Sequence, residues 1–417
     1  MIDGVASRRK VGVFHPGTQH SWQTSRALQE LDDLAWYATS IFHIPNRLPY
    51  SLVPFLPNRV RKIAQGELRR FEYPELDASL VHLFGANQWA MRICARLGWR
   101  RWADQIRFRD NVAFAKPVGR LLRKNPVRAV WGYDLSSLEV FETAQELGSK
   151  RVLDQSIGHP RAYNAIMEDV YLAYPEFFPS SDYKLPHSLI DRVDREYDLA
   201  DIVTVGSEFC RSTFVAPNQA TSTGQKVRVV DYCYEDTFFD TNFRSEKCRR
   251  PIRFLFLGQA GPRKGIHLLL KVFERIPSTA ASLTIVGDLL VPIDTFRRYS
   301  ERLTYKRTVP RADVPAVMRD ADCLIFPSYF EGAGIVLYEA LASGLGIIQS
   351  RNAATVADRG VGLLMEELSE DELYRCVMSV VDNPSLIDTW RAKATEVITN
   401  YTFEAYKNRV RGVSSDV

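Results

Sequence analysis

The sequence predicts an α/β protein with two doubly wound, Rossmann-like domains, each built on a parallel sheet. The chain has 417 residues, more than one hydrophobic core usually holds, so two domains of about 200 residues each are expected. Short apolar runs of strand length alternate with helical patterns in both halves of the chain. This order of elements is typical of a parallel sheet that is covered by helices.

The first half shows strands and helices in regular alternation. An apolar strand opens the chain and is followed by a loop and a helix, and a complete βαβ unit comes later. The strands expected in this half lie at 10–14, 129–133, 150–156, 201–206 and 226–230. We expect the first domain to cover residues 1–235, with a polar, irregular linker at 231–250.

The second half begins with an almost wholly apolar strand at 252–257, as expected for a strand that is covered on both faces. The helix after it carries apolar residues at helical spacing. Further strands are expected at 283–287, 323–326 and 346–350. We expect the second domain to cover residues 250–400.

Two glutamates are distinctive in the second half. Glu331 lies in a glycine-rich turn after the strand 323–326, and Glu339 lies inside the apolar helix that leaves this turn. Turns after parallel strands lie at the carboxyl edge of the sheet, where open α/β folds bind ligands. We therefore expect Glu331 at the mouth of a crevice. Glu339 should have a partner, because buried carboxylates need one.

The two glutamates, in an EG-x-G-x4-EA-x-A-x-G setting, resemble those of the family-four retaining glycosyltransferases. That family has the GT-B fold, in which two Rossmann-like domains face each other across a cleft. The resemblance implies that Glu331 contacts the donor sugar and that Glu339 holds the ribose hydroxyls of the nucleotide. The resemblance also implies that the backbone of Gly332, Ala333, Gly334 and Ile335 lies near the sugar or the diphosphate. The alternative is an ordinary strand, turn and helix with one surface glutamate and one half-buried glutamate.

A basic pair, Arg263 and Lys264, lies in the loop between the strand 252–257 and the next helix. The helix dipole, free backbone amides and cationic side chains together favour a phosphate there. The loop is similar to the family's G-R-x4-K-G segment, whose Arg and Lys bind the diphosphate and stabilise the leaving group. Lys264 matches the Lys, whereas Gln259 stands where Arg is usual. Our hypothesis is that Arg263 supplies the missing charge.

Two positions in the first half complete the expected site. His159 lies in a Gly-His-Pro turn after the strand 150–156, with Pro160 at the start of a helix. The family has a His near the donor hexose at this point, so the resemblance makes His159 a sugar contact. The alternative is a structural histidine that is satisfied within the fold. The family's glycine-rich loop after the first strand is reduced here to Gly17.

Basic residues are concentrated at 96–128, which holds ten Lys or Arg against two Asp. Four aromatic residues are interleaved with them: Trp99, Trp102, Phe108 and Phe114. Such a stretch either binds an anionic membrane surface, here the inner leaflet, or forms a solvated helical face whose aromatic side chains belong to the core. The net charge of +4 is too small to indicate nucleic acid, and no recognition motif accompanies it.

The six cysteines are scattered singly, without a C-x-x-C motif. This pattern predicts reduced thiols, no zinc site and a cytoplasmic location. No apolar run approaches the length of about 18 residues that a transmembrane helix needs. The start of the chain also lacks the apolar segment of a signal peptide, so we expect neither a membrane span nor a signal peptide.

The resemblance implies a retaining glycosyltransferase that moves a hexose from a nucleotide-diphosphate sugar to a glycan or lipid-linked acceptor, in surface polysaccharide or glycoconjugate synthesis. It implies that no metal and no cofactor are needed besides the donor substrate. It also implies that the final helix, within 401–417, crosses back to the first domain. The alternatives are a sugar-nucleotide epimerase of the same fold, a non-catalytic nucleotide-sugar-binding protein and an oxidoreductase with twin Rossmann domains. The absence of G-x-G-x-x-G after the first strand argues against the oxidoreductase.

Overall fold

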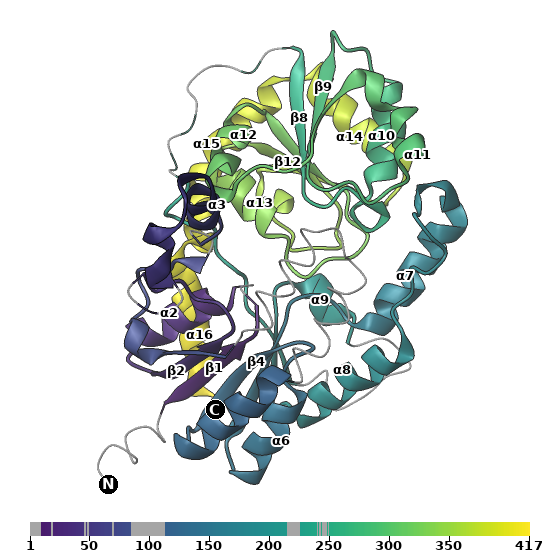
Figure 1. Cartoon of the computed structure of the whole chain (residues 1–417). Helices are drawn as coiled ribbons and strands as arrows, with labels where there is room; N and C mark the ends of the chain where they lie inside the picture. The colour runs from purple at the N-terminus through teal and green to yellow at the C-terminus, as the bar shows by residue number, and fades with distance from the viewer. Residues whose placement is uncertain are drawn as a thin grey trace.

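The structure of the protein is a computed structural model (Figure 1). It describes residues 10–17, 20–45, 47, 50–68, 71–84, 113–214, 226–239, 241, 243, 248 and 250–417. The expected α/β architecture is confirmed, because two parallel sheets with helices packed on their faces form two Rossmann-like halves. In Figure 1 the first half, purple to teal, lies below the second half, green to yellow.

In the described ranges the first sheet has seven strands. These are β1 (Val11–His15), β2 (Leu34–Thr39), β3 (Val81–Leu83), β4 (Ala129–Tyr133), β5 (Lys150–Gln155), β6 (Ile202–Val205) and β7 (Val227–Val229). All neighbours pair in parallel in the order β3-β2-β1-β4-β5-β6-β7. The strand order reverses between β1 and β4, and a ligand crevice is expected at the carboxyl ends of these two strands.

The described part of this half also contains helices, several of which contact the first sheet. The labelled helices are α2 (Ser21–Glu30), α3 (Asn58–Leu68), α6 (Leu138–Glu146), α7 (Pro160–Ala173), α8 (His187–Leu199) and α9 (Glu208–Ser212), with the 3₁₀ helices η1 (Tyr50–Phe55), η3 (Ala78–Leu80) and η4 (Pro175–Phe177). Local signals start two of them. Pro160 is the first residue of α7, and the Ser207 hydroxyl accepts a hydrogen bond from the Cys210 amide at the start of α9.

The second sheet has six strands. These are β8 (Ile252–Leu257), β9 (Ala281–Val286), β10 (Leu303–Lys306), β11 (Cys323–Phe326), β12 (Gly346–Gln349) and β13 (Gly362–Leu364). All neighbours pair in parallel in the order β10-β9-β8-β11-β12-β13. The order reverses between β8 and β11, so the loops that follow these two strands meet at the second crevice.

Helices also connect the strands of the second half. They are α10 (Ile266–Glu274), α11 (Ile293–Arg297), α12 (Val314–Arg319), α13 (Ile335–Ala342), α14 (Glu370–Asp382), α15 (Ser385–Val397) and α16 (Phe403–Ser415), with the 3₁₀ helices η6 (Pro262–Lys264), η7 (Ser300–Arg302), η8 (Arg311–Asp313), η9 (Ala357–Arg359) and η10 (Ile398–Tyr401). Almost the whole of α10 is buried, which agrees with its apolar composition.

The last helix, α16, packs on α2 of the first half (Figure 1). Lys407 on α16 lies 2.8 Å from Glu30, and the hydroxyls of Tyr406 and Thr24 are 2.7 Å apart. The guanidinium of Arg26 lies 3.8 Å from the ring centroid of Phe403. The chain thus returns to the first half after it has completed the second sheet.

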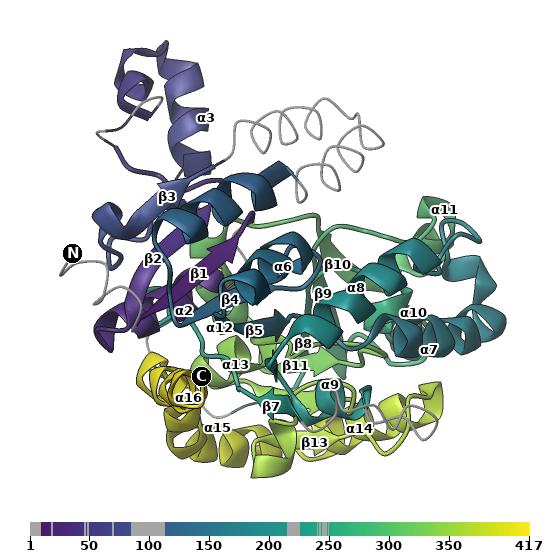
Figure 2. The same cartoon turned by 90° about the horizontal axis from the view of Figure 1, so that it is seen from below.

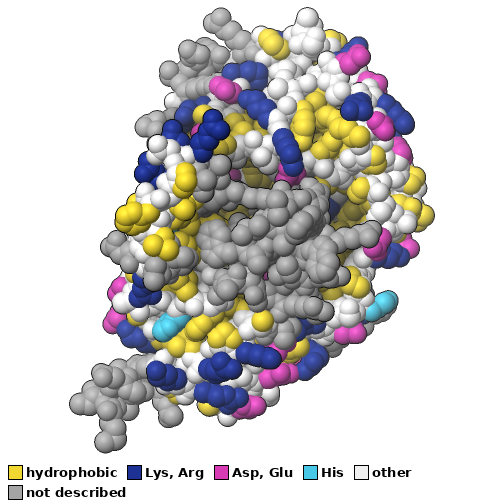
Figure 3. All heavy atoms as spheres, in the orientation of Figure 1, with side chains coloured by type: hydrophobic (Ala, Val, Ile, Leu, Met, Phe, Trp, Pro, Cys, Tyr) yellow, Lys and Arg dark blue, Asp and Glu magenta, His cyan; other side chains and the backbone are white. Residues whose placement is uncertain are grey.

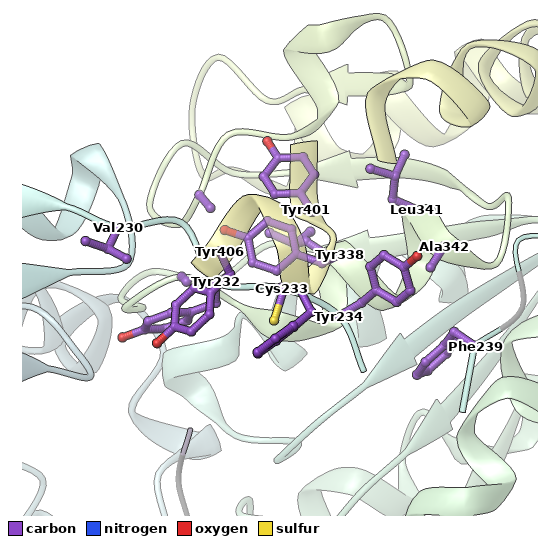
Figure 4. Close-up of a cluster of buried hydrophobic side chains, with 14 of the residues drawn as sticks. Val230, Tyr232, Cys233, Tyr234, Phe239, Tyr338, Leu341, Ala342, Tyr401 and Tyr406 are labelled. Atoms are coloured by element: carbon purple, nitrogen blue, oxygen red, sulfur yellow. The ribbon is translucent and has the colours of Figure 1, made fainter. Parts of the chain in front are cut away.

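An aromatic cluster joins the two halves where the linker passes α13 and α16 (Figure 4). Tyr338 on α13 stacks on Tyr401 with ring centroids 4.5 Å apart. Tyr232 of the linker meets Tyr406 of α16 edge to face at 6.5 Å. All four rings are buried, so the hydrophobic core continues through this junction.

A second connection lies at the far end of α7. Phe177 in η4 is fully buried within the core of the second half. The Thr295 hydroxyl donates to the Glu176 carbonyl at 3.0 Å, and the ring of Tyr174 lies 4.2 Å from that of His267. The two halves are therefore joined on both sides of the crevice.

Most of the basic stretch predicted at 96–128 lies outside the described residues. Its described part is helical at 113–124, with Phe114 buried in the core of the first half and with Lys116, Arg120, Arg123 and Lys124 exposed. The described part of the stretch therefore agrees with the alternative prediction, a solvated helical face whose aromatic side chain belongs to the core. No helix in the described ranges is long and apolar enough to cross a bilayer.

Candidate functional site

The carboxyl edges of the two sheets face each other at the turn that carries Glu331. A Cβ atom at Gly332 would lie 1.9 Å from the carbonyl oxygen of Ser156, just after β5, and one at Gly206 would lie 2.7 Å from the Cβ of Ala333. The Ser207 hydroxyl donates to the Gly332 carbonyl. The turn at 330–334 therefore lies directly on the ends of β5 and β6, and glycine is required for this close approach.

Two glycines in left-handed backbone conformations shape the second crevice. Gly334, with φ of 82°, ends the turn and begins α13. Gly265, with φ of 70°, begins α10, and a Cβ there would lie 2.1 Å from the Pro327 carbonyl oxygen. Gly265 therefore lets the loop after β8 lie directly on the chain that follows β11, where a side chain would not fit.

Glu331 is 7% exposed and lies between the two cations of the β8–α10 loop. Its Oε1 atom is 2.5 Å from Arg263 Nη1 and 2.5 Å from Lys264 Nζ. Arg263 Nη1 also donates to the Phe330 carbonyl at 2.7 Å. The structure thus brings the basic pair of one loop to the glutamate of another, and two positive charges converge on one carboxylate.

Lys264 is the more enclosed of the two cations. Its Nζ atom lies 4.6 Å from the ring centroid of Phe326, the last residue of β11. Burial lowers the pKa of the Lys264 ammonium, and the Glu331 carboxylate opposes that lowering. The ammonium is therefore held at the crevice by an anion that a bound phosphate could replace.

Glu339 is 2% exposed on α13, and its partner is a residue that the sequence did not suggest. Arg311 Nη2 lies 2.6 Å from Glu339 Oε1, and Arg311 Nε lies 3.3 Å from Glu235 Oε2. Burial acts to lower the pKa of Arg311, but Glu339 and Glu235 outweigh it and raise that pKa. The expectation of a partner for Glu339 is thus met by the loop between β10 and α12.

His159 is buried on the first half, with its ring nitrogens engaged there. Its Nδ1 atom accepts from the Arg161 amide at 3.1 Å and so caps α7, while Nε2 lies 3.3 Å from Asp194 Oδ1. Burial lowers the pKa of His159, and Asp194 opposes this. The backbone beside it does reach the second half, because a Cβ at Gly158 would lie 2.6 Å from the Phe330 ring. The sugar-contact role of His159 stays a prediction.

The remaining predicted positions lie on the loops around the crevice. The Gly17 amide donates to His15 Nδ1 at 3.0 Å, and burial lowers the pKa of His15 to about 4. Gln259 is exposed in the loop after β8. Ala333 is buried and Ile335 is half-buried.

Sequence reasoning missed a buried network at the carboxyl edge of the first sheet. Asp154 in β5 is 2% exposed and accepts from Trp131 Nε1 at 3.3 Å and from the Tyr232 hydroxyl at 3.2 Å. His20 Nε2 lies 3.0 Å from Asp154 Oδ1. The position of Asp154 near the end of a buried strand could have indicated this network, because a buried carboxylate must be paired inside the fold. Among the described residues, no group of three or more His, Cys, Asp or Glu side chains could hold a metal ion.

Two Rossmann-like halves, whose sheets face each other at their carboxyl edges, define the GT-B fold. The solved structure of sucrose-phosphate synthase from Thermosynechococcus elongatus superposes on this chain with a TM-score of 0.65 at 15% identity, covering 98% of this chain and 99% of that one. At this level of identity the similarity concerns the fold.

The family is indicated by the second half. Residues 238–397 match the family model described as glycosyl transferases group 1, so the chain carries a domain of that family within the GT-B fold. The resemblance noted in the sequence is thereby confirmed at the level of the group 1 domain.

Two curated relatives align over part of the chain. The D-inositol 3-phosphate glycosyltransferase of Corynebacterium glutamicum is 32% identical over 144 residues, which is 31% of this chain and 34% of that protein. The lipopolysaccharide glucosyltransferase WaaG of Escherichia coli is 28% identical over 151 residues, which is 34% of this chain and 40% of that protein. The chain thus matches between a third and two fifths of the length of these relatives.

Proposed function

We propose that the protein is a retaining glycosyltransferase that moves a hexose from a nucleotide-diphosphate sugar to a glycan or lipid-linked acceptor. The observation that carries the proposal is the convergence of Arg263 and Lys264 on Glu331 at the crevice, within a group 1 domain. Glu339 lies on α13, the helix that begins after the turn of Glu331. In this proposal the nucleotide lies on the second half and the acceptor approaches from the first.

The proposed reaction breaks the bond between the anomeric carbon and the diphosphate. Negative charge then grows on the leaving phosphate, and groups fixed in advance to receive that charge lower the barrier. Lys264, Arg263 and the amino end of α10 are the groups of this chain that would receive it. Glu331 would release these cations to the diphosphate and turn toward the hydroxyls of the sugar.

The same proposal holds that the transferred sugar keeps its anomeric configuration and that no metal ion takes part. Two cations and a helix end supply the positive charge that a metal ion supplies in other sugar transferases, and the donor phosphate would take the proton of the acceptor. No cofactor is needed, because the nucleotide-diphosphate sugar is itself a substrate. The close contact of the turn at 330–334 with β5 and β6 would exclude water from the reacting bond.

The acceptor is proposed as a glycan or a lipid-linked molecule in surface polysaccharide or glycoconjugate synthesis, reached from the cytoplasm. The relatives support this range, because their names specify an inositol phosphate and a lipopolysaccharide as the molecules that are glycosylated. An O-antigen chain mannosyltransferase of Escherichia coli is also 26% identical over 175 residues, which is 37% of this chain and 45% of that protein.

A nucleotide panel tests the proposal first. Thermal shifts with UDP, GDP, TDP, CDP and ADP should identify one stabilising nucleotide, because a ligand at about a hundred times its Kd adds roughly 2.7 kcal/mol to the free energy of unfolding. Glu339→Gln should lose that shift, whereas Glu372→Gln, which removes a buried carboxylate of α14 paired with Arg375, should keep it. If no nucleotide stabilises the wild type, the proposal fails.

Turnover of the matching nucleotide sugar then separates the alternatives. A transferase releases the nucleotide faster when an acceptor is present and forms a product whose anomeric configuration equals that of the donor, as seen by NMR. An epimerase converts the donor without an acceptor, and a binding protein leaves the donor unchanged. Either of these two results would replace the proposal.

A further inference from the structure

A helical protrusion stands away from the first half, beside β3 and far along the chain from the crevice residues. It consists of η1 (Tyr50–Phe55) and α3 (Asn58–Leu68). Figure 2 shows this protrusion clear of the body of the molecule, at the upper left. Its two ends are fixed, because Tyr50 and Leu68 are both buried. We name the residues 50–68 the η1–α3 protrusion.

The tip of the η1–α3 protrusion is apolar and exposed. Four consecutive residues at the tip are exposed, namely Pro54, Phe55, Leu56 and Pro57. The Phe55 side chain is 84% exposed and Leu52 is 55% exposed. A fully solvated phenylalanine beside further exposed apolar residues costs free energy in water, so such a tip marks a surface that binds something apolar.

The tip is held in shape by its own hydrogen bonds. Arg61 Nη1 donates to the Pro54 carbonyl at 3.2 Å, and Arg61 also donates to Asn58 Oδ1. The Arg61 amide donates to the Pro57 carbonyl at 2.8 Å. The apolar residues are therefore displayed by a braced turn with two prolines, and little conformational freedom is lost when they become buried.

The charge around the tip is positive. Residues 50–68 contain Arg59, Arg61 and Lys62 against the single acid Glu67, and Arg59 and Lys62 are exposed. Dark blue and yellow side chains lie together over η1 and α3 at the left edge of Figure 3. An apolar tip with basic flanks matches the interface of an anionic bilayer, where acyl chains lie beneath a negative headgroup layer.

We propose that the η1–α3 protrusion docks the protein on an anionic lipid surface, with Phe55, Leu56 and Leu52 entering the interface and Arg59 and Lys62 binding the headgroups. The tip is a convex knob with basic flanks, which favours a soft, negatively charged layer over a second copy of this chain. This inference does not depend on the sugar-transfer reaction. It also concerns a different segment from the basic stretch 96–128.

Vesicle co-sedimentation of the full chain, without donor or acceptor, tests the proposal. The wild type should bind vesicles of phosphatidylcholine with phosphatidylglycerol more tightly than vesicles of phosphatidylcholine alone, and this preference should fall with added salt. Leu52→Ser/Phe55→Ser should lower the partition coefficient on both kinds of vesicle by about tenfold or more. Arg59→Glu/Lys62→Glu should abolish the preference for phosphatidylglycerol.

Matched control variants carry the same changes elsewhere on the surface. Leu172→Ser removes an apolar side chain of α7 that is 73% exposed, and Arg297→Glu/Arg298→Glu reverses two exposed basic residues beside η7. Both controls should bind like the wild type. All variants alter exposed side chains, so circular dichroism and thermal unfolding should match the wild type.

Two kinds of result would overturn the proposal. One is a wild type that fails to bind the anionic vesicles, or tip variants that bind them as well as the wild type does. The other is a wild-type dimer, seen by sedimentation velocity, that Leu52→Ser/Phe55→Ser dissociates while vesicle binding is absent. The second result would assign the tip to a contact between copies of the chain. Because no transfer is measured, failure here and failure of the proposed reaction are distinguishable.

Discussion

Arg311 lies between two carboxylates, with Nη2 at 2.6 Å from Glu339 Oε1 and Nε at 3.3 Å from Glu235 Oε2. Glu235 belongs to the segment that connects the two halves, and Glu339 to α13 of the second half. One guanidinium therefore links the connecting segment to the helix that we propose as the ribose site. A nucleotide that binds Glu339 would have to share this carboxylate with Arg311 or displace it.

Replacement of Arg311 tests the importance of this link. Arg311→Ala should lower the free energy of unfolding by about 1–3 kcal/mol, because Glu339 would stay buried without its cation. The loss is kept modest because Arg311 is itself partly exposed. Arg307→Ala is the control on the same loop, since that side chain is exposed and pairs with Asp288 at 3.3 Å, and it should change stability by less than about 0.5 kcal/mol. Equal urea-unfolding midpoints for the two variants would contradict this prediction.

Lys264 is predicted to act on the leaving phosphate. Lys264→Met should lower kcat by about a hundredfold to a thousandfold, which corresponds to about 2.7–4 kcal/mol of transition-state stabilisation. Lys271→Met is the control, because Lys271 lies on α10, the helix that follows Lys264, but pairs with Glu370 at 3.1 Å. The kcat of this variant should stay within a few fold of wild type. Initial-rate kinetics with the nucleotide sugar identified in the panel measure both variants.

Arg263 is tested by the same assay. Arg263→Ala should also lower kcat, because we propose that it replaces the arginine that is usual at the position of Gln259. Activity that is lost in Lys264→Met but kept in Arg263→Ala would refute that hypothesis and reduce the anion site to one cation.

Asp134 should make stability depend on pH. Burial raises the pKa of this carboxyl to about 6, against an ordinary value of 3.8. The folded state thus binds the proton more tightly than the unfolded state, so the free energy of unfolding falls as pH rises from about 4 to about 7. Asp134→Asn should flatten that fall, since an amide oxygen can still accept from the Ser156 amide.

Urea unfolding at several pH values measures this slope. Asp182→Asn is the control, because Asp182 is exposed on the same half, and its slope should equal that of the wild type. A slope that is unchanged in Asp134→Asn would show that other groups cause the pH dependence.

His159 is best tested by a pair of substitutions. His159→Ala should lower the free energy of unfolding by about 1 kcal/mol, because α7 loses the acceptor for its Arg161 amide. His159→Asn should restore most of that loss, since asparagine is a good N-cap residue. If His159 contacts the donor sugar, the stable asparagine variant should have strongly reduced turnover. Turnover equal to that of the wild type would instead support a structural histidine, because both ring nitrogens are engaged within the first half.

The sequence predicted those strands, turns and helices whose signal lies within a short stretch of the chain. The apolar runs that became β1, β4, β5, β8, β11 and β12 were predicted, because a strand covered on both faces must be apolar along its length. The turn at Glu331 and the basic pair Arg263 and Lys264 were also visible. Glycines and charges that follow a strand directly mark the carboxyl edge of a sheet.

Four strands were missed, namely β2, β3, β10 and β13. β3 and β13 are three residues long, and β10 alternates between half-buried and exposed side chains. β2 is long and buried, but it follows α2 after a turn without glycine or proline and was not distinguished from the surrounding chain. β3, β10 and β13 are edge strands of their sheets, where burial is incomplete and the apolar pattern is weak.

The tertiary structure alone decided which charges meet. Arg311 and Glu339 are separated by 28 residues in the chain, and Glu235 lies 76 residues before Arg311, so no spacing rule links them. The orientation of His159 was decided in the same way, because Asp194 of α8 engages one ring nitrogen and the Arg161 amide at the start of α7 engages the other. Local sequence determined where strands, turns and helices form. The packing of loops and helices around each sheet determined the partners of the buried charges, because those partners come from elements that are distant in the chain.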